Sequence, residues 1–288
     1  RDLHKEYRRQ RQMCIRDSRC TVPHWLPHRF TNVTRFAHDL KLIGTHLSDK
    51  YIAIYQPDRL AGKTHQAFDV GAVRTLWVRG ILEDEYGVKP SDISWRNGGL
   101  EEAGRKERSR LTLSEGVELE SIPADQTLSQ WLVEGKIDAL VTARAPSCFL
   151  NGTPKIGRLF PDYPAVERAY YEKTRLFPIM HIIGIRKSLY ERHPWLAVNV
   201  YNAFAEAKRL CYAGIGEIGH LQTSLPWPVA AYDEACALMG EDLWSYGIAP
   251  NLAEIETVTR YPYDQGLAQK KLTPDELFAP STFEISKI

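Results

Sequence analysis

The stretch TLSQWLVEGKIDALVTAR (127–144) decides the fold class, because it holds one complete helix-to-strand unit. Thr127 is a residue type that caps helices, and the residues after it place their apolar side chains at helical spacing over 128–134. Gly135 is typical of the position just past a helix end. The apolar run 137–143 then predicts a strand of the kind that is buried in a sheet covered by helices.

The same alternation extends toward the N-terminus. Runs of β-forming residues predict strands at 51–55, near 64–68, at 93–95 and at 117–122, with a helix over 73–86 that Gly87 closes. Strands that alternate with helices favour an α/β fold with mainly parallel sheets covered by helices.

Longer helices are predicted in the second half of the chain. A strand at 179–185 follows the Pro- and Tyr-rich stretch 158–178, and a long helix runs from Pro194 to about Ala213, with Gly214 beyond its end. The expected buried side of that helix carries Leu196, Val200, Phe204, Ala207 and Cys211. Capping boxes predict two later helix starts, at Asn251 with Glu254 and at Thr273 with Glu276.

Composition excludes several classes of protein. The chain has 288 residues, enough for two packed lobes, since single cores stop growing near about 250–300 residues. A formal net charge of +1 argues against the basic field that nucleic-acid binding needs, and no apolar run approaches the roughly 18 residues of a membrane span. Five cysteines without a CxxC pair predict free thiols in a reducing compartment, and therefore a cytoplasmic protein.

Residues 1–20 differ from the rest of the chain, with seven Lys or Arg against three Asp or Glu and no regular periodicity. One interpretation is a basic arm that binds nucleic acid. The other, which we favour, is a non-native tail, because MCIRDS within this segment resembles translated sequencing-adapter sequence.

Motifs for nucleotides and metals are near misses. Gly62-Lys63-Thr64 lacks the first glycine of a P-loop, whose place Pro57 takes. His24 and His28 are four residues apart, but Pro27 interrupts the helix that a zinc pair would favour. No metal site is therefore predicted.

Eight segments, in the same order, resemble the 4,5-dihydroxyphthalate decarboxylase family. They are RTLWVRGILEDEYGV (74–88), GGLEEAGR (98–105), GKIDALVTARAPSCF (135–149), RLFPDY (158–163), TRLFPIMHIIGIRK (174–187), HPWLAVNVYNAFAEAK (193–208), DLWSYGI (242–248) and RYPYDQGL (260–267). The resemblance covers roughly residues 50–280 and fails before Tyr51. It therefore implies a chain that lacks the opening elements of its first lobe.

That family is similar in fold to type II periplasmic binding proteins, in which ligand binds between two α/β lobes joined by two crossing strands. The resemblance implies a first crossing near 51–58 and a return near 179–184. The expected division is a non-native tail at 1–20, a remnant of the first lobe at 21–54, the second lobe at 55–180, and the return into the first lobe with the C-terminal helices at 181–288. Fold alone does not fix chemistry.

The family's reaction removes one carboxylate from 4,5-dihydroxyphthalate to give protocatechuate. Each carboxyl lies para to a hydroxyl, so protonation of the carboxylate-bearing ring carbon avoids an aryl carbanion. Such a site needs an acid, an acceptor for the phenolic proton and a cationic clamp for the second carboxylate. The resemblance implies no cofactor.

Arg144 is the predicted clamp, because it sits where the strand at 137–143 ends and an Arg fork can hold a carboxylate through two hydrogen bonds. The alternative for Arg144 is a salt bridge to a surface acid, and we give the two interpretations about equal weight. Arg74 and Thr75, in the first turn of their helix, are expected to favour an anion there. A solvated helix start is equally open for them.

His181, in the apolar segment FPIMHIIGI, is the candidate proton donor, because imidazole titrates near neutral pH. Glu101, in a glycine-flanked loop, is the candidate acceptor of the phenolic proton. The alternative for His181 is a core histidine whose hydrogen bonds are satisfied, and the alternative for Glu101 is a solvated carboxylate. Both alternatives are favoured over the catalytic roles. Tyr246 and Trp244 could stack on an aromatic ring, although packing in the core is the safer interpretation for them.

Two functions from different classes stay open at this point. The first is a cofactor-independent decarboxylase acting on a small aromatic dicarboxylate. The second is the solute-binding protein of an ABC transporter for an aromatic or other small anionic ligand. A third possible function is a transferase or synthase on the same scaffold, but the sequence contains no cofactor-binding motif that would support it. No nucleic-acid or membrane partner is expected, and a homo-oligomer is left open.

Overall fold

The computed structural model describes residues 40–44, 52–55, 64–67, 73–104, 116–142, 145–154, 156–217, 219 and 223–285. They fall into two compact units, which are described separately. The first contains the described residues of Asp49–Val166 and Thr257–Leu272, and the second those of Ala37–Ser48, Glu167–Glu256 and Thr273–Ile288.

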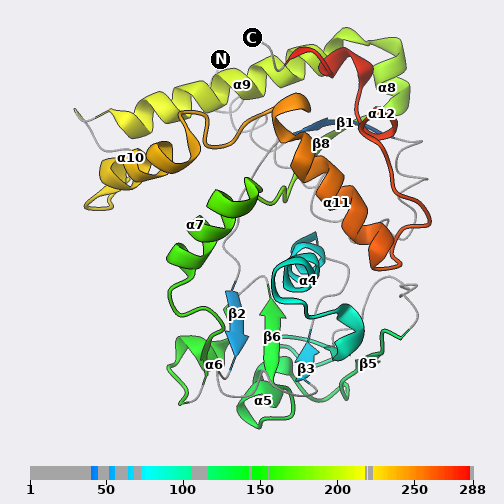
Figure 1. Ribbon diagram of the computed structural model, residues 1–288, viewed down its shortest axis with the longest axis vertical. Helices are drawn as coiled ribbons and strands as arrows, with labels where there is room; N and C mark the ends of the chain where they lie inside the picture. The colour runs from blue at the N-terminus through cyan, green and yellow to red at the C-terminus, as the bar shows by residue number, and fades with distance from the viewer. Residues whose placement is uncertain are drawn as a thin grey trace, which may run out of the picture. The chain divides into compact units, whose positions relative to one another are not determined.

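A mixed, six-stranded sheet forms the centre of the first unit (Figure 1). Its strands, in the order β5-β4-β3-β6-β2-β7, are β5 Leu119–Ser121, β4 Ile93–Asn97, β3 Thr64–Ala67, β6 Ala139–Thr142, β2 Ile52–Tyr55 and β7 Gly157–Arg158. The pairs β3–β4, β3–β6 and β4–β5 are parallel, whereas β2 pairs antiparallel with β6 and β7. The predicted α/β class is confirmed, with an antiparallel edge on a parallel centre.

The helices of this unit begin and end where local signals place them. They are α4 Val73–Tyr86, α5 Leu128–Val133 and α6 Ser147–Leu150, with the short 3-10 helix η3 at Pro90–Asp92. The Thr127 side chain accepts a hydrogen bond from the Gln130 backbone N–H at 3.3 Å, which confirms it as the cap of α5. Gly87 and Gly135 follow α4 and α5 with φ of 68° and 69°, in the left-handed region that glycine adopts without strain.

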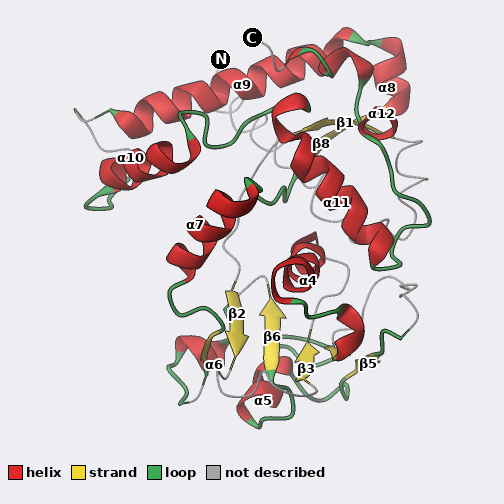
Figure 2. Ribbon diagram, in the orientation of Figure 1, coloured by secondary structure: helices red, strands yellow, loops and turns green. Residues whose placement is uncertain are grey.

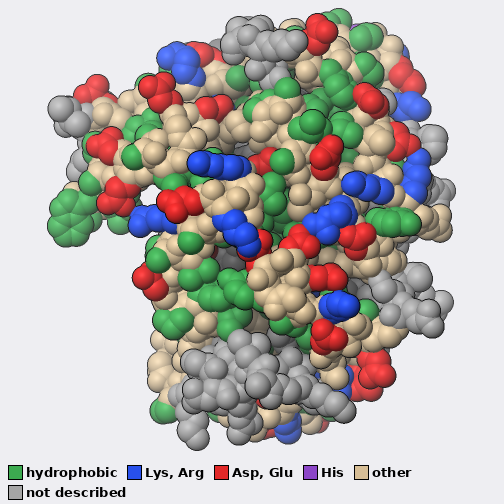
Figure 3. Space-filling model, in the orientation of Figure 1, with side chains coloured by type: hydrophobic (Ala, Val, Ile, Leu, Met, Phe, Trp, Pro, Cys, Tyr) green, Lys and Arg blue, Asp and Glu red, His purple; other side chains and the backbone are tan. Residues whose placement is uncertain are grey.

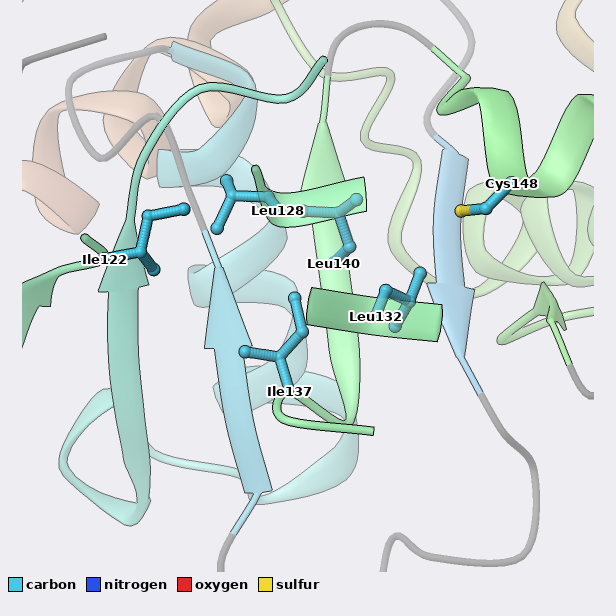
Figure 4. Close-up of a cluster of buried hydrophobic side chains, with 6 residues drawn as sticks. All are labelled: Ile122, Leu128, Leu132, Ile137, Leu140 and Cys148. Atoms are coloured by element: carbon cyan, nitrogen blue, oxygen red, sulfur yellow. The ribbon is translucent and has the colours of Figure 1, made fainter. Parts of the chain in front are cut away.

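Helices pack on both faces of this sheet (Figure 2). On one face, a buried cluster joins the end of β5, α5, β6 and α6 (Figure 4). Its members are Ile122, Leu128, Leu132, Ile137, Leu140 and Cys148. On the other face, Ile93 and Trp95 of β4 and Val141 of β6 pack against Val78 of α4. The strand at 139–142 is therefore buried on both sides, as its apolar sequence predicts.

Helix α4 also packs closely against the second half of α11 (Leu252–Asp264), which belongs to the same unit. The rings of Trp77 and Tyr261 meet edge to face, with centroids 5.4 Å apart. The Tyr261 hydroxyl donates to Asp84 Oδ2 at 2.8 Å, and Asp84 also pairs with Arg260. At Gly80, a Cβ would lie only 2.3 Å from Cζ of Tyr261, so the contact depends on glycine.

Gly80→Ala is therefore expected to destabilise the protein. Tyr261 is 2% exposed and cannot move aside, and overpacking of this kind costs about 1–3 kcal/mol. Alanine recovers only about 1 kcal/mol through its higher helix propensity. Urea denaturation measures the change, and a Tyr261→Leu background serves as the control, because the clash is absent there. Equal or higher stability of Gly80→Ala in the parent background would contradict this packing.

The second unit is mainly helical, with a small antiparallel sheet of β1 (Leu40–Gly44) and β8 (Ile182–Arg186). Its elements are most of α7 (Tyr163–Thr174), then α8 Lys187–Arg192, α9 Trp195–Gly216, α10 Pro228–Met239, η4 Ala249–Asn251, the first half of α11, α12 Pro274–Leu277 and η5 Pro280–Thr282. The boundary between the units falls inside α7 and α11. The capping box at Thr273 is confirmed: Glu276 Oε2 accepts from the Thr273 backbone N–H at 3.0 Å.

Several predictions in this unit need correction. The strand predicted at 179–185 begins only at Ile182. Helices α7 and α10 were not predicted; each carries a proline in its first turn, Pro164 and Pro228, a position where proline is tolerated.

The predicted buried side of α9 is also wrong in part. The helix extends past Gly214 to Gly216, and its buried residues are Ala197 and Tyr201. Leu196 and Val200 are half-buried, whereas Phe204, Ala207 and Cys211 are exposed. The half-buried side continues instead through Ala205, Lys208 and Tyr212, so the predicted apolar stripe lies one position away around the helix. The reason is that the segment 242–246 packs against α9 along that side.

The described residues also show how apolar and charged side chains are distributed. None of the described helices is both long and apolar enough to cross a membrane. Acidic and basic side chains are intermixed over the face shown in Figure 3, in keeping with the small net charge.

Candidate active site

The carboxyl edge of the parallel strands in the first unit gathers most of its predicted site residues. Because β3, β4 and β6 run parallel, their C-terminal ends lie at one edge of the sheet. The loop 98–104 follows β4, helix α6 follows β6, and α4 is the next helix after β3. In open α/β sheets, ligands bind outside this edge.

Two of the predicted anion-binding positions lie here, and a third cannot be placed. Arg74 and Thr75 are in the first turn of α4, as predicted, although their side chains are outside the described structure. Arg144 itself lies outside the described residues, two positions after Thr142, the last residue of β6. Their roles in binding a carboxylate stay predictions.

Glu101 has a defined set of partners in the loop after β4. Its Oε1 accepts a hydrogen bond from the Ser147 backbone N–H at 2.6 Å, and its Oε2 accepts one from the Ser147 hydroxyl at 2.8 Å. Ser147 Oγ lies 3.3 Å from Oγ of Ser129, which is buried. Ser147 was not singled out from the sequence, although it lies in the segment 135–149, because it is 46 residues away from Glu101 along the chain.

The loop that carries Glu101 is itself anchored. Its carbonyl oxygens at Gly99 and Leu100 accept hydrogen bonds from the backbone N–H groups of Leu128 and Ser129, at 2.9 and 3.1 Å. These bonds satisfy N–H groups in the first turn of α5, which have no partner within the helix. Gly98 lies so close to Ile122 that a Cβ would be 2.4 Å from its side chain. The residues that immediately precede Glu101 are therefore held in place.

His181 lies in the second unit, immediately before β8. The residue is half-buried, and its Nδ1 is buried without a hydrogen-bond partner among the described residues. A core histidine is normally hydrogen-bonded, because an unsatisfied buried polar atom costs about 1–3 kcal/mol. Among the described residues, Nδ1 thus lacks the partner that a satisfied core histidine has, and the proton-donor role stays a prediction.

Trp244 and Tyr246 belong to a cluster around Lys208 of α9, also in the second unit. Lys208 Nζ donates to the Trp244 carbonyl oxygen at 2.7 Å and lies 4.3 Å from the ring centroid of Tyr246. It also pairs with Asp242. The Tyr212 hydroxyl accepts a hydrogen bond from the Trp244 backbone N–H at 3.0 Å. Lys208 thus ties the segment 242–246 to α9.

The aromatic rings of this cluster pack mainly on one another. Trp244 meets Phe177 edge to face at 5.7 Å, and Tyr246 meets Tyr201 at 6.5 Å. Burial raises the pKa of Tyr246 and of Tyr201 above the usual phenol value, and nearby Asp242 adds to both. These phenols are therefore neutral donors or acceptors at physiological pH. The contacts are those expected for packing, and a role in binding substrate stays a prediction.

A buried arginine of α4 was also not predicted. Arg79 is 3% exposed, and burial lowers the pKa of its guanidinium to about 10, so it stays charged at neutral pH. Its guanidinium carbon lies 6.0 Å from the ring centroid of Trp95 in β4. Within the described ranges, no group of three or more His, Cys, Asp or Glu side chains could hold a metal ion.

Comparison with known proteins identifies relatives over most of this chain. No family model matches it. A 4,5-dihydroxyphthalate decarboxylase from Comamonas testosteroni is 39% identical over 235 residues, which is 82% of this chain and 71% of the relative. The chain belongs to the 4,5-dihydroxyphthalate decarboxylase family.

A second 4,5-dihydroxyphthalate decarboxylase, from Pseudomonas putida, is 39% identical over 112 residues, and the match spans 43% of that relative. The family predicted from the eight sequence segments is thereby confirmed. Both relatives are named as enzymes, and the alternative of a transporter's solute-binding protein finds no support among them. In this member of the 4,5-dihydroxyphthalate decarboxylase family, Arg74, Thr75 and Glu101 belong to the first unit and His181, Trp244 and Tyr246 to the second.

Proposed function

We propose that this protein decarboxylates 4,5-dihydroxyphthalate, or a similar hydroxylated aromatic dicarboxylate, to 3,4-dihydroxybenzoate (protocatechuate) and CO2. The observation that carries the proposal is the 39% identity to a named 4,5-dihydroxyphthalate decarboxylase over 235 residues. That match includes most of this chain, so it extends beyond a single shared motif.

The reaction exchanges a carboxylate for a proton at one ring carbon. The phenolic proton para to that carbon leaves, and the ring carbon takes up a proton from an acid, which gives a cyclohexadienone that still carries the carboxylate. The bond between the ring and the carboxylate then breaks, its electron pair restores the aromatic ring, and CO2 departs. The phenolate regains a proton, so the net reaction consumes one proton. Side chains can supply this proton transfer and the accompanying charge stabilisation.

His181 is the proposed acid for the ring carbon. An imidazolium donates a proton readily near neutral pH, and the Nδ1 of His181 has no described partner that would hold its proton in another bond. Arg144 is the proposed clamp for the carboxylate that stays on the ring, with Arg74 and Thr75 at the start of α4 contributing to the same anion-binding environment. Trp244 and Tyr246 are proposed as the aromatic surface next to the substrate ring.

We infer a two-lobed, type II periplasmic-binding-protein-like fold for this protein. Support comes from the parallel centre of the six-stranded sheet and from the division of the chain into two compact units. In the expected scheme 55–180 is one lobe, and 181–288 with the remnant 21–54 is the other. Three described cysteines, Cys148, Cys211 and Cys236, are free thiols, which supports the expected reducing, cytoplasmic compartment.

The direct test is incubation of the purified protein with 4,5-dihydroxyphthalate. Release of CO2 together with an equal amount of 3,4-dihydroxybenzoate is the expected result, and in D2O the new ring hydrogen should be deuterium. Phthalate is the matched control, because it lacks the para hydroxyl that makes ring protonation feasible. Tight binding of 4,5-dihydroxyphthalate without turnover would overturn the proposal and favour a carrier.

A further inference from the structure

A contact between Glu101 and Ser147 joins the loop after β4 to the start of α6, at the carboxyl edge of the six-stranded sheet. The two oxygens of one carboxylate accept hydrogen bonds from two different groups of one residue, its backbone N–H at 2.6 Å and its hydroxyl at 2.8 Å. Hydrogen bonds to an ionised acceptor are about twice as strong as neutral ones. Such a two-point contact fixes both the place and the rotation of Ser147.

Ser147 is also held from its other side. Its Oγ lies 3.3 Å from Oγ of Ser129, which is only 4% exposed, and the next residue, Cys148, is part of the buried cluster with Leu132 and Leu140. Strand β6 ends at Thr142 and is buried on both faces. Ser147, at the start of α6, is therefore fixed to the body of the first unit.

We propose that Glu101 is a positioning residue, which holds Ser147 and the start of α6 in place at the carboxyl edge of the sheet and thereby supports binding of the substrate carboxylate. This inference rests on the proposed function, in which the carboxyl edge of the sheet binds a dicarboxylate. It replaces the expectation that Glu101 accepts the phenolic proton. Protonating its carboxylate during turnover would weaken both bonds to Ser147 at the moment when the substrate must be held.

Two substitutions at Glu101 separate these roles. Glutamine cannot act as a base near neutral pH, but its Oε1 can accept from the Ser147 N–H while its Nε2 donates to Ser147 Oγ, whose own proton can point to Ser129. Alanine removes both contacts. A base would therefore be lost in both variants, whereas a positioning contact would be lost in Glu101→Ala and largely kept in Glu101→Gln.

The experiment is steady-state kinetics of CO2 release from 4,5-dihydroxyphthalate by the full chain. Glu101→Ala is expected to raise KM about tenfold with kcat within about twofold, and Glu101→Gln to raise KM no more than about threefold. The exposed neighbour Glu102, changed to alanine, is the matched control and should leave both constants unchanged. A fall of about 100-fold in kcat for Glu101→Gln would overturn the inference in favour of a base. Unchanged constants in Glu101→Ala would overturn it as well.

Hydrogen exchange tests the same inference without turnover. In the substrate-free protein, the Ser147 amide should exchange about tenfold faster in Glu101→Ala than in the parent, and close to the parent rate in Glu101→Gln. The parent protein could fail to decarboxylate the substrate while Ser147 still exchanges faster in Glu101→Ala. That result would support the contact and reject only the proposed function. Equal exchange in Glu101→Ala and the parent would reject the positioning role.

Ser147→Ala provides a second variant in case Glu101→Ala folds poorly. It keeps the backbone hydrogen bond to Glu101 and loses the hydroxyl bond, so it is expected to give a smaller rise in KM.

Discussion

Replacing His181 by glutamine is expected to lower kcat by about 100-fold or more, because a positioned general acid contributes about 10²–10⁴-fold and an amide has no acidic proton to give. Glutamine keeps a polar side chain that can occupy the half-buried position before β8. Substrate affinity should therefore change by less than about threefold. Single-turnover measurements of CO2 release, with KM determined in parallel, distinguish the two effects.

His193 provides a matched control for this experiment. It is an exposed histidine of the same unit, at the C-terminal end of α8, and its ring lies against Trp195 at 5.9 Å. His193→Gln should leave kcat and KM within about twofold of the parent values. Retained turnover in His181→Gln, accompanied by a lower melting temperature, would assign His181 to the core and leave the proton donor to be found elsewhere.

Replacing Arg144 by alanine is expected to weaken binding of 4,5-dihydroxyphthalate by about 10- to 100-fold, because a charge-assisted pair with a carboxylate is worth roughly 1.5–3 kcal/mol. Position 144 comes two residues after the end of β6, and ligands of open α/β sheets bind outside the carboxyl ends of the strands. Isothermal titration calorimetry with 3,4-dihydroxybenzoate, which keeps one carboxylate, measures the loss without interference from turnover.

Two further variants make the Arg144 result specific. Arg144→Lys keeps the charge but loses the planar fork, so it should recover only part of the affinity. Arg168→Ala removes an exposed arginine paired with Glu234 and should leave the affinity unchanged. An unchanged dissociation constant in Arg144→Ala would remove this residue from the binding site.

Elements with strong local signals could be predicted closely from the sequence. Helix α4 has the bounds expected from its apolar spacing and from Gly87, and α5 begins at the expected cap, Thr127. The strand after Gly135 also forms as predicted, because its apolar run fits a sheet with helices on both faces. In each case the information lies within a few residues of the element.

Features that depend on distant residues could not be predicted. The bond between Glu101 and Ser147 joins positions 46 apart, and the contact of Tyr261 with Asp84 joins positions 177 apart. The inward side of α9 is set by the segments that pack against it, such as 242–246, and the spacing of apolar residues in the helix does not record them. The contact of Glu101 with Ser147 could not be predicted for the same reason, since nothing near Glu101 in the sequence points to its partner.

The close approach of α4 and α11 at Gly80 has a consequence for how this sequence can diverge. A side chain at position 80 fits only if the ring at position 261 becomes smaller, and loss of that ring also removes the hydroxyl that Asp84 accepts from. A substitution at position 80, 84 or 261 is therefore tolerated only with compatible residues at the other two positions. In orthologous genes these sites should covary as a group, with glycine retained wherever the tyrosine is present.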